Sequence, residues 1–307
     1  MSGSREKMKK RGKRTGALLL GLVILCAAAL LNIPVSGVFS SEILKPEEGE
    51  LKVHFIDVGQ ADCILIQSQD QNMLIDAGNN DDEQTIVSYL HKQGITELDY
   101  VIGTHGHEDH IGSMDTVIEQ FEIGKFYLPA QTYETKSYDD VIKAAREKGL
   151  DIEKPKFKEK EKLGSAEFIF ITPDAEKEYE DLNDSSIGIR ISDGRHSFLL
   201  CGDISAAMEH ELIESRIYLH ADVLKINHHG SSDTSSMEFL KKVDPGYAVI
   251  SCGEKNDFGH PHKATLKKLK KLGIQVFRTD KLGTIVFTSS QGHLTCNTLA
   301  EEEWMEN

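Results

Sequence analysis

The sequence contains few cysteines and no Cys-x-x-Cys pair. Five cysteines are spread over 307 residues, and Cys26 lies in the apolar N-terminal run. Their wide spacing excludes a compact zinc knot built on cysteine, which requires closely spaced pairs. Cys63 and Cys201 lie inside apolar runs, so we interpret them as small buried hydrophobic residues. No disulfide framework is expected, although one disulfide stays compatible with an exported protein.

Positive charge is scarce outside the N-terminus. Residues 1–41 carry seven Lys and Arg and one acid, which leaves 28 basic and 49 acidic residues and a net charge of −21 for the rest. Such an acidic domain repels polyanions on average, which excludes a general basic surface for nucleic acids. Bound metal ions would reverse the sign of the charge locally.

Long hydrophobic runs are also scarce, because the sequence has a single one at residues 17–39, directly after the basic residues 1–16. This order is typical of an export signal whose positive end stays in the cytoplasm. The run is long enough to span a bilayer as an uncleaved anchor. Cleavage after Gly37 or Ser40 would instead release the protein. The sequence therefore predicts a single-pass membrane protein with its domain outside the cytoplasm, or a secreted protein.

The remaining chain divides into a linker at 40–50, one domain at 51–300 and an acidic tail at 301–307. With 39% hydrophobic and 28% charged residues, the composition is that of a globular protein. Periodic apolar patterns predict secondary structure. The expected helices are 84–93, 111–121, 137–148, 206–217, 236–243 and 263–272. The main expected strands are 51–57, 63–66, 72–78, 98–103, 125–128, 167–172, 187–191, 197–201, 221–227, 247–251, 274–278 and 284–288.

This interleaving of strands and helices indicates an α/β fold with two sheets covered on the outside by helices. The charge run 154–162 is interpreted as a solvated loop or a strand edge. Asp193-Gly194, between two predicted strands, is a strong hairpin signal. Every candidate functional residue follows the end of a predicted strand, where side chains from separate strands can converge.

A dense group of potential metal ligands follows the predicted strand 98–103. His105, His107, Glu108, Asp109 and His110 place three imidazoles and two carboxylates in six consecutive residues. Imidazole and carboxylate are ligands for zinc and similar divalent ions. We expect His105 and His107 to chelate one ion, and Asp109 and His110 to face a second, with Asp109 also taking part in catalysis. A solvated His-rich loop is the alternative, and Glu108 is interpreted as a solvent-facing or helix-capping residue.

A second group of candidates follows two later strands. Asp203 comes after the predicted strand 197–201, and His228 and His229 come after 221–227. A Gly-Asp pair alone is a common turn, but its place after a buried strand predicts that Asp203 is a ligand. One of His228 and His229 is expected to bind metal, with the other behind it or acting as a proton donor. A turn with two satisfied histidines is the alternative.

The motif His105-x-His107-x-Asp109-His110 resembles the signature of the metallo-β-lactamase superfamily. Residues 75–78 and 202–203 resemble two further elements of that family. More narrowly, the chain resembles the extracellular hydrolase domain of ComEC/Rec2 competence proteins. The carrying segments are 57–62, 183–186, 200–203, 222–232, 256–262 and 278–283.

The resemblance implies an αββα four-layer sandwich with two divalent metal ions, Zn²⁺ or Mn²⁺. It implies that Asp203 bridges the ions and that a bridging hydroxide attacks a phosphodiester in line. His229 or His260 would protonate the leaving oxygen, although His260 fits a plain loop histidine equally well. Asp62 and Asp76 are expected to orient ligand histidines from behind. Lys225, Lys263 and Arg278 are weaker candidates for phosphate binding, as surface charges near predicted strand ends.

Two features depart from the family pattern. Many relatives have a histidine ligand where Asn183-Asp184-Ser185 occurs here, so Asn183, Asp184 or a water is expected to fill that position. Competence proteins also carry this domain on a channel with many membrane spans, whereas this chain has one apolar run. We therefore do not expect DNA uptake to transfer with the resemblance.

The sequence as a whole predicts an exported metal-dependent hydrolase. The favoured activity is a phosphodiesterase or nuclease acting on DNA, with single-stranded DNA as a candidate substrate and protein partners left open. A cell-envelope esterase acting on phosphocholine-type phosphoesters is the alternative enzyme. A metal-bound but catalytically silent envelope binding module is the alternative from another class, and the intact ligand set counts against it.

Overall fold

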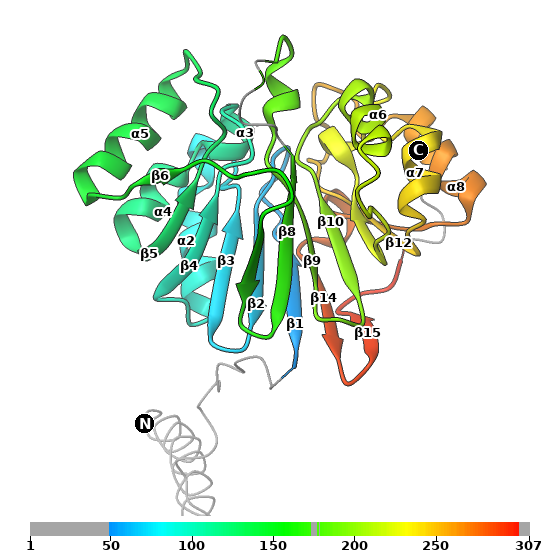
Figure 1. Cartoon of the computed structure of the whole chain (residues 1–307), viewed down its shortest axis with the longest axis horizontal. Coiled ribbons are helices and arrows are strands. Elements are labelled where there is room, and N and C mark those ends of the chain that lie inside the picture. The colour runs from blue at the N-terminus through cyan, green and yellow to red at the C-terminus, as the bar shows by residue number, and fades with distance from the viewer. Residues whose placement is uncertain (1–48, 173–176, 178, 301–307) are drawn as a thin grey trace, which may run out of the picture. The chain divides into compact units, whose positions relative to one another are not determined.

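Two β-sheets stack face to face, and helices cover the outer face of each (Figure 1). The computed structural model describes residues 49–172, 177 and 179–300. The first sheet has the order β15 (His293–Cys296), β14 (Ile285–Ser290), β1 (Leu51–Phe55), β2 (Ile64–Ser68), β3 (Gln71–Ile75), β4 (Glu97–Ile102), β5 (Glu122–Tyr127) and β6 (Ile152–Glu153). The second has the order β13 (Gln275–Arg278), β12 (Tyr247–Ile250), β11 (Val223–Lys225), β10 (Ser197–Leu200), β9 (Gly188–Ser192), β8 (Ala166–Thr172) and β7 (Lys160–Leu163).

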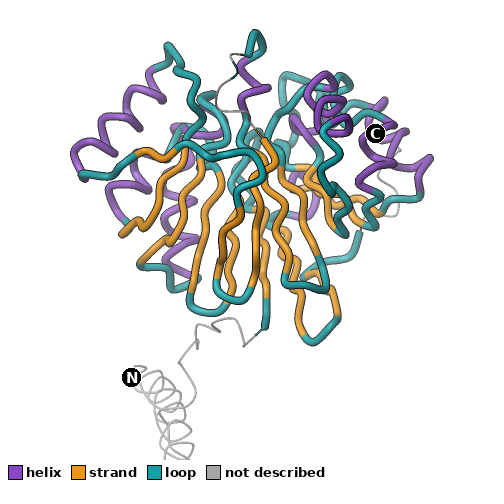
Figure 2. The backbone as a smooth tube through the Cα atoms, in the orientation of Figure 1, coloured by secondary structure: helices purple, strands orange, loops and turns teal. Residues whose placement is uncertain are grey.

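The helices form the two outer layers (Figure 2). The first sheet is covered by α2 (Glu83–Lys92), α4 (Met114–Gln120) and α5 (Lys136–Lys148), and the second by α6 (Ala206–Glu214), α7 (Met237–Val243) and α8 (Lys263–Leu272). The short helical elements are η2 (Asn80–Asp82), α3 (Glu108–Ile111), η3 (Leu182–Ser185), η4 (Asn227–Gly230) and α9 (Thr279–Leu282). The expected αββα four-layer sandwich of the α/β class is thus confirmed.

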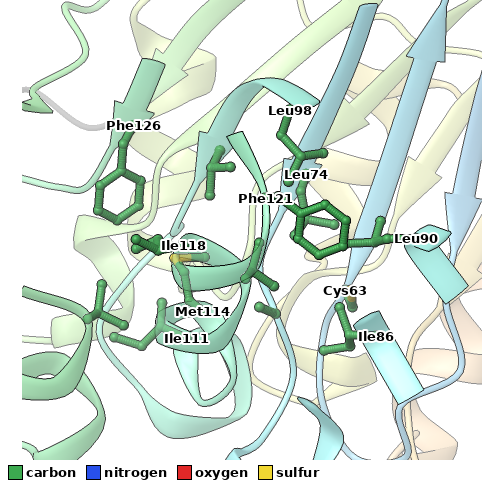
Figure 3. Close-up of a cluster of buried hydrophobic side chains, with 14 of the residues drawn as sticks. Cys63, Leu74, Ile86, Leu90, Leu98, Ile111, Met114, Ile118, Phe121 and Phe126 are labelled. Carbon is green, nitrogen blue, oxygen red and sulfur yellow. The ribbon is translucent and has the colours of Figure 1, made fainter. Parts of the chain in front are cut away.

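Alternating side chains of the strands build separate cores on the two faces of each sheet. In β2, Ile64 and Ile66 pack between the sheets, whereas Leu65 packs under the helices. The helix-side core of the first sheet is drawn in Figure 3, where Leu74 and Leu98 meet residues of α2 and α4. Because both faces are covered, β2 and β10 contain the apolar runs Ile64-Leu65-Ile66 and Phe198-Leu199-Leu200.

Strand direction determines where the loops meet. Strands β3 to β6 are parallel to one another, and so are β10 to β13. The carboxyl ends of parallel neighbours lie at one edge of their sheet. The loops after β3 and β4 therefore lie together, and so do the loops after β10, β11 and β12.

The expected helix 111–121 is interrupted, which corrects that prediction. It is replaced by α3 and α4, which are separated at Gly112 and Ser113. The Ser113 amide donates to the carbonyl of Ala77 (3.0 Å) in the loop after β3. Gly112 allows the close approach, since a Cβ there would lie 2.3 Å from the carbonyl carbon of Asn79. The helix thus breaks where it contacts the loop that carries Asp76.

The remaining differences are small. The charge run 154–162 leads into the edge strand β7, which is the strand-edge alternative. Asp193-Gly194 does form a hairpin between antiparallel β9 and β10, and the Asp193 carboxylate accepts from the amides of Arg195 and His196 at 2.8 Å each. The helix α9 was not expected from the sequence.

The proposed basic region 1–16, the apolar run 17–39, most of the linker 40–50 and the tail 301–307 lie outside the described residues. Within residues 49–172, 177 and 179–300, no helix is both long enough and apolar enough to cross a bilayer.

The buried His54 in β1 provides a test of the fold's response to acid. Burial, followed by the nearby charge of Lys52, lowers the pKa of His54 to about 4 from 6.5. The folded state therefore favours the neutral imidazole. The contribution of His54 to the stability of the fold is fully present above pH 6.5 and is lost as the pH falls from 6.5 towards 4. Between pH 7 and pH 4 the free energy of unfolding should fall in both proteins. We expect this fall to be smaller in His54→Gln than in the native chain, by up to about 3 kcal/mol.

Urea unfolding of both proteins at the two pH values measures this difference. Other titrating groups are common to both proteins, so they cancel in the comparison. An identical loss of stability in the variant would show that His54 does not carry the effect.

Candidate metal centre

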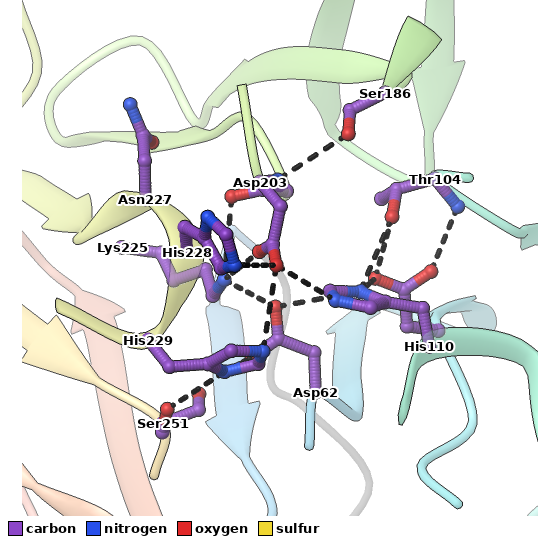
Figure 4. A network of polar contacts seen from close by, with 12 residues as sticks. Asp62, Thr104, His110, Ser186, Asp203, Lys225, Asn227, His228, His229 and Ser251 are labelled. Atoms are coloured by element: carbon purple, nitrogen blue, oxygen red, sulfur yellow. Dashed lines mark hydrogen bonds and ion pairs between the residues drawn. The ribbon is translucent and has the colours of Figure 1, made fainter. Parts of the chain in front are cut away.

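Four strand ends bring the candidate ligands together, and Figure 4 shows His110, Asp203 and His229 pointing toward one another. Asp76 follows β3, and the His-rich stretch follows β4 and forms α3. Asp203 follows β10, and His229 lies in η4 after β11. The two sheets thus each contribute half of the site, because the strands that carry these residues end at the same side.

Four of the predicted ligands form a close set. One ligand atom from each of Asp109, His110, Asp203 and His229 lies within 4.8 Å of all the others. Asp203 Oδ2 is 3.2 Å from His110 Nε2 and 3.5 Å from His229 Nε2. His110, Asp203 and His229 are buried, whereas the Asp109 side chain is 32% exposed and marks the open side of the site.

Two buried polar atoms of this set lack a hydrogen-bond partner, which indicates the kind of ligand that the set would bind. Within the described part of the chain, His110 Nε2 and Asp203 Oδ1 are buried and make no hydrogen bond. Buried polar atoms are normally satisfied, so such atoms call for a missing partner. Two imidazoles and two carboxylates that converge on one point match the ligands of a divalent cation such as Zn²⁺ or Mn²⁺. The residues therefore fit the metal ions that the sequence predicts.

Partners behind the histidines fix which ring nitrogen faces the site. His110 Nδ1 lies 2.8 Å from Asp76 Oδ2, and Asp76 also accepts from the Thr104 amide (2.7 Å) and hydroxyl (2.8 Å). His229 Nδ1 donates to the carbonyl of Ser251 at 3.0 Å. In the neutral form of each ring the proton is held on Nδ1, which leaves the Nε2 lone pair for a metal ion. Asp76 thus has the orienting geometry that the sequence predicts for it.

The electrostatics of the site show a surplus of negative charge. Burial lowers the pKa of His110, but the carboxylates of Asp203, Asp76 and Asp109 raise it well above its usual value overall. Burial raises the pKa of Asp203, but His110 and His229 lower it well below its usual value overall. A positively charged His110 therefore balances these carboxylates when no other cation is present. A divalent ion would take over that role.

His105 and His107 lie beside this set and contact each other. His105 Nε2 is 3.0 Å from His107 Nδ1, and the rings of His105 and His110 have centroids 4.1 Å apart. Burial lowers the pKa of His105 well below 6.5, so the imidazole is in the neutral form that binds metal. Gly106 is needed for this turn, because a Cβ there would lie 2.3 Å from the Tyr133 ring.

Ser186 follows the segment 183–185, for which the family pattern predicts a histidine ligand, and its hydroxyl contacts His105. Ser186 Oγ lies 3.3 Å from His105 Nδ1 and accepts from the Asp203 amide at 3.3 Å. Asp184 instead accepts from the amide (2.8 Å) and hydroxyl (3.0 Å) of Ser205, at the start of α6. A place for Asp184 beside the metal ions therefore stays a prediction. Asn183 Oδ1 is buried and, among the described residues, makes no hydrogen bond.

His228 and His229 have different positions although they are adjacent. His229 is 1% exposed and belongs to the close set, whereas the His228 side chain is 35% exposed, with Nε2 3.7 Å from Asp203 Oδ2. Both have a positive φ, 50° and 51°, as does Asp76 at 60°. A positive φ in these residues stores strain of about 1–3 kcal/mol each, which typically occurs at functional sites.

His260 borders the open side of the site without entering the close set. Its ring stacks on His229 with centroids 6.2 Å apart, and Gln60 Nε2 donates to His260 Nδ1 at 3.3 Å. Burial and the neighbouring histidines lower the pKa of His260 to about 4. In this environment the His260 ring is neutral at neutral pH.

Lys225 is the site residue that sequence reasoning placed wrongly, because it is buried and not a surface charge. It is 1% exposed, forms an ion pair with Asp62 Oδ2 and lies 3.6 Å from Asp203 Oδ1. Burial lowers the pKa of Lys225, but Asp62 and Asp203 raise it overall. Asp62, predicted to orient a histidine, pairs with Lys225 and lies 3.7 Å from the Nδ1 atoms of His110 and His229.

Asp76→Asn tests the orienting role of Asp76. We expect Zn²⁺ or Mn²⁺ to bind about 10- to 100-fold more weakly, because the neutral amide no longer fixes His110. Isothermal titration calorimetry measures the affinity. Asp222→Asn is a matched control, since Asp222 also accepts from an amide (2.8 Å) and a hydroxyl (3.0 Å) of one residue, Ser197. Equal weakening in both variants would assign the effect to general destabilisation.

Lys225→Met tests the buried ion pair. Removing this cation leaves the charges of Asp62 and Asp203 uncompensated. With chelator present, we therefore expect the free energy of unfolding to be about 3–5 kcal/mol lower than that of the native chain. Urea unfolding gives the value. The double variant Asp62→Asn/Lys225→Met should recover much of the loss, because the partner charge is removed as well. No recovery would mean that Lys225 acts through its packing.

Known proteins are similar to this chain in sequence. ComE operon protein 3 of Bacillus subtilis is 31% identical over 258 residues, which covers 78% of this chain and 33% of that protein. Recombination protein 2 of Haemophilus influenzae is 28% identical over 273 residues, covering 86% of this chain and 31% of that protein. The chain thus spans about a third of the length of these relatives, and the expected similarity to competence proteins is confirmed.

A solved structure gives the same fold. The metallo-beta-lactamase fold protein YhfI of Bacillus subtilis matches with a TM-score of 0.53 and 17% identity, over 78% of this chain and 99% of that one. At this identity the likeness concerns the fold alone. Residues 56–254 match the family described as the Metallo-beta-lactamase superfamily. With its His105-to-His110 motif and Asp203 in place, the chain belongs to the metallo-β-lactamase superfamily.

Proposed function

We propose that this chain is a metal-dependent phosphodiesterase that hydrolyses DNA. The observation that carries the proposal is the close set of Asp109, His110, Asp203 and His229, whose ligand atoms converge within 4.8 Å. The similarity to ComE operon protein 3 and Recombination protein 2 supports DNA as the substrate. A phosphodiester is an anion, so it suits a site where cations meet at an open edge.

The residues divide between two ions. His105 and His107 would hold one ion, and Asp109, His110 and His229 the other, with Asp203 shared between them. When bound, such ions lower the pKa of water and neutralise charge on the phosphoryl oxygens. Asp76 and the Ser251 carbonyl keep the rings of His110 and His229 in place, which preserves the geometry through the reaction.

The open side of the site has side chains that can handle the leaving group. Asp109 is partly exposed there, and His228 and His260 lie next to each other with ring centroids 5.8 Å apart. Burial lowers the pKa of both rings, so we assign to this pair a hydrogen bond from a neutral imidazole to the leaving oxygen. His229 is less suited to the role, because its Nε2 faces the ligand set.

Asp109→Ala tests the proposed reaction. In Mn²⁺ or Zn²⁺, we expect the full-length chain to cleave single-stranded DNA, and the variant to lose at least about 100-fold in rate, since a ligand matters more than an outer partner. Glu108→Ala is the matched control. Glu108 is the neighbouring carboxylate, but it accepts from Asn80 Nδ2 (2.7 Å) and lies outside the close set. Chelator should abolish cleavage.

Other substrates separate the remaining functions. Hydrolysis of phosphocholine esters without DNA cleavage would replace the nuclease by an envelope esterase. Bound metal without hydrolysis of DNA, bis-p-nitrophenyl phosphate or phosphocholine esters would indicate a silent binding module. Equal loss of activity in Asp109→Ala and Glu108→Ala would contradict the assigned site.

We further propose that the protein is exported and held in the membrane by residues 17–39. The basic residues before this run and its apolar length support the proposal. Protease treatment of intact cells, with the chain followed by an antibody to the domain, tests it. Protection of the domain from external protease would contradict it, and release into the medium would indicate a cleaved signal.

A further inference from the structure

The loop between β12 and α8 holds an exposed phenylalanine next to the metal centre. Phe258 is 67% exposed, and its ring stacks on His260 with centroids 5.6 Å apart and planes 20° apart. His260 in turn stacks on the ligand-set residue His229 at 6.2 Å and 27°. Phe258 is therefore two stacking steps from the close set, with its exposed ring at the open side.

The loop is fixed by hydrogen bonds from Asn256. Asn256 Oδ1 accepts from the His260 amide at 2.9 Å, and Asn256 Nδ2 donates to the carbonyls of Gly253 (2.8 Å) and His260 (2.6 Å). One side chain thus closes the loop around Phe258. From the inner side, Gln60 accepts from the Gly253 amide at 3.1 Å and donates to His260.

His262 fixes Phe258 itself. The Ser232 amide donates to His262 Nδ1 at 2.8 Å, so the proton lies on Nε2, which donates to the Phe258 carbonyl at 3.1 Å. This link connects Phe258 to the segment that follows the strained turn of His228 and His229. The ring is therefore presented to solvent by a pre-organised loop, and binding would require little further ordering.

Packing does not explain this exposure. In the described part of the chain, the large hydrophobic residues that are exposed are Phe157, Tyr218, Phe258 and Leu299. Tyr218 is 66% exposed, but its ring lies against Arg190 (4.9 Å) and His220. Phe258 differs because its ring stack leads towards the metal centre. A flat apolar surface held rigidly beside the place where the phosphodiester is proposed to bind suits a ligand with a flat ring next to its phosphate.

We propose that Phe258 stacks on a nucleobase next to the cleaved phosphodiester, so that the substrate is a single-stranded nucleic acid. This rests on the proposed function. Base stacking on an aromatic side chain requires an unpaired base and tolerates any sequence. It also adds affinity without basic residues, which matters for a region with a net charge of −21. A single ring is a poor fit for a quaternary ammonium group, which is usually bound by a cage of several rings.

Binding of a short single-stranded DNA to the full-length chain tests the proposal. Fluorescence anisotropy in the Asp109→Ala background separates binding from cleavage. We expect Phe258→Leu, which keeps an apolar side chain without a ring, to weaken binding about 5- to 150-fold. Phe258→Trp should bind at least as tightly as the native residue. Tyr218→Leu, with equal exposure outside the site, should change the Kd less than about twofold.

An abasic position in the DNA provides an independent readout. The abasic site is placed at each position of the strand in turn. At one position it should weaken binding to the native chain by about the same factor as Phe258→Leu does, and at that position it should not weaken binding to Phe258→Leu any further. An abasic effect that persists in Phe258→Leu would overturn the stacking assignment. So would equal affinity for a fully paired duplex.

The failures can be told apart. If the native chain cleaves DNA but Phe258→Leu binds like Tyr218→Leu, stacking is wrong and the proposed function stands. If the native chain neither binds nor cleaves DNA, the proposed function and this inference both fail. If Phe258→Leu instead raises the KM for a phosphocholine ester, the ring binds a cation and the inference is overturned.

Discussion

Uncompensated negative charge at the edge of two sheets is the constraint on which the site depends. Asp62, Asp76 and Asp203 are each at most 2% exposed, and burying an isolated carboxylate is too costly unless it is paired. Within the described residues, Lys225, His110 and His229 are buried beside carboxylates that raise their pKa values and favour their cationic forms. The ligand side chains at the neighbouring strand ends are arranged so that further cations, the metal ions, can bind beside these carboxylates.

The backbone near the ligands is held in conformations that would be unfavourable elsewhere. Asp76, His228 and His229 have a positive φ, which costs about 1–3 kcal/mol per residue. The strain persists because the strands leading into these turns are buried in two cores and cannot shift. The fold thus stabilises the positions of the ligands. Metal binding and folding are therefore expected to be coupled.

Much of this could be predicted from the sequence, because the relevant information is local. The motif from His105 to His110 and its place after an apolar strand predict both a metal site and its edge of the sheet. The roles of Lys225 and Ser186 could not be predicted, because they depend on contacts with Asp62 and His105 in loops far away in the sequence. The break at Gly112 was missed for a similar reason, since it follows from packing against the loop at Asn79. The apolar periodicity of a helix carries no information about the backbone of another segment that packs against it.

The acidic composition and the proposed anionic substrate are compatible once distance is considered. At physiological ionic strength the Debye length is about 8 Å, so exposed acids on far parts of the surface contribute little at the site. The carboxylates inside the site are shielded from salt, but they are the groups that cations neutralise. A substrate phosphate would therefore experience the local balance of cations and ligands and not the net charge of the chain. This separation limits non-specific binding to long polyanions while it permits binding at one place, because no extended basic surface is needed.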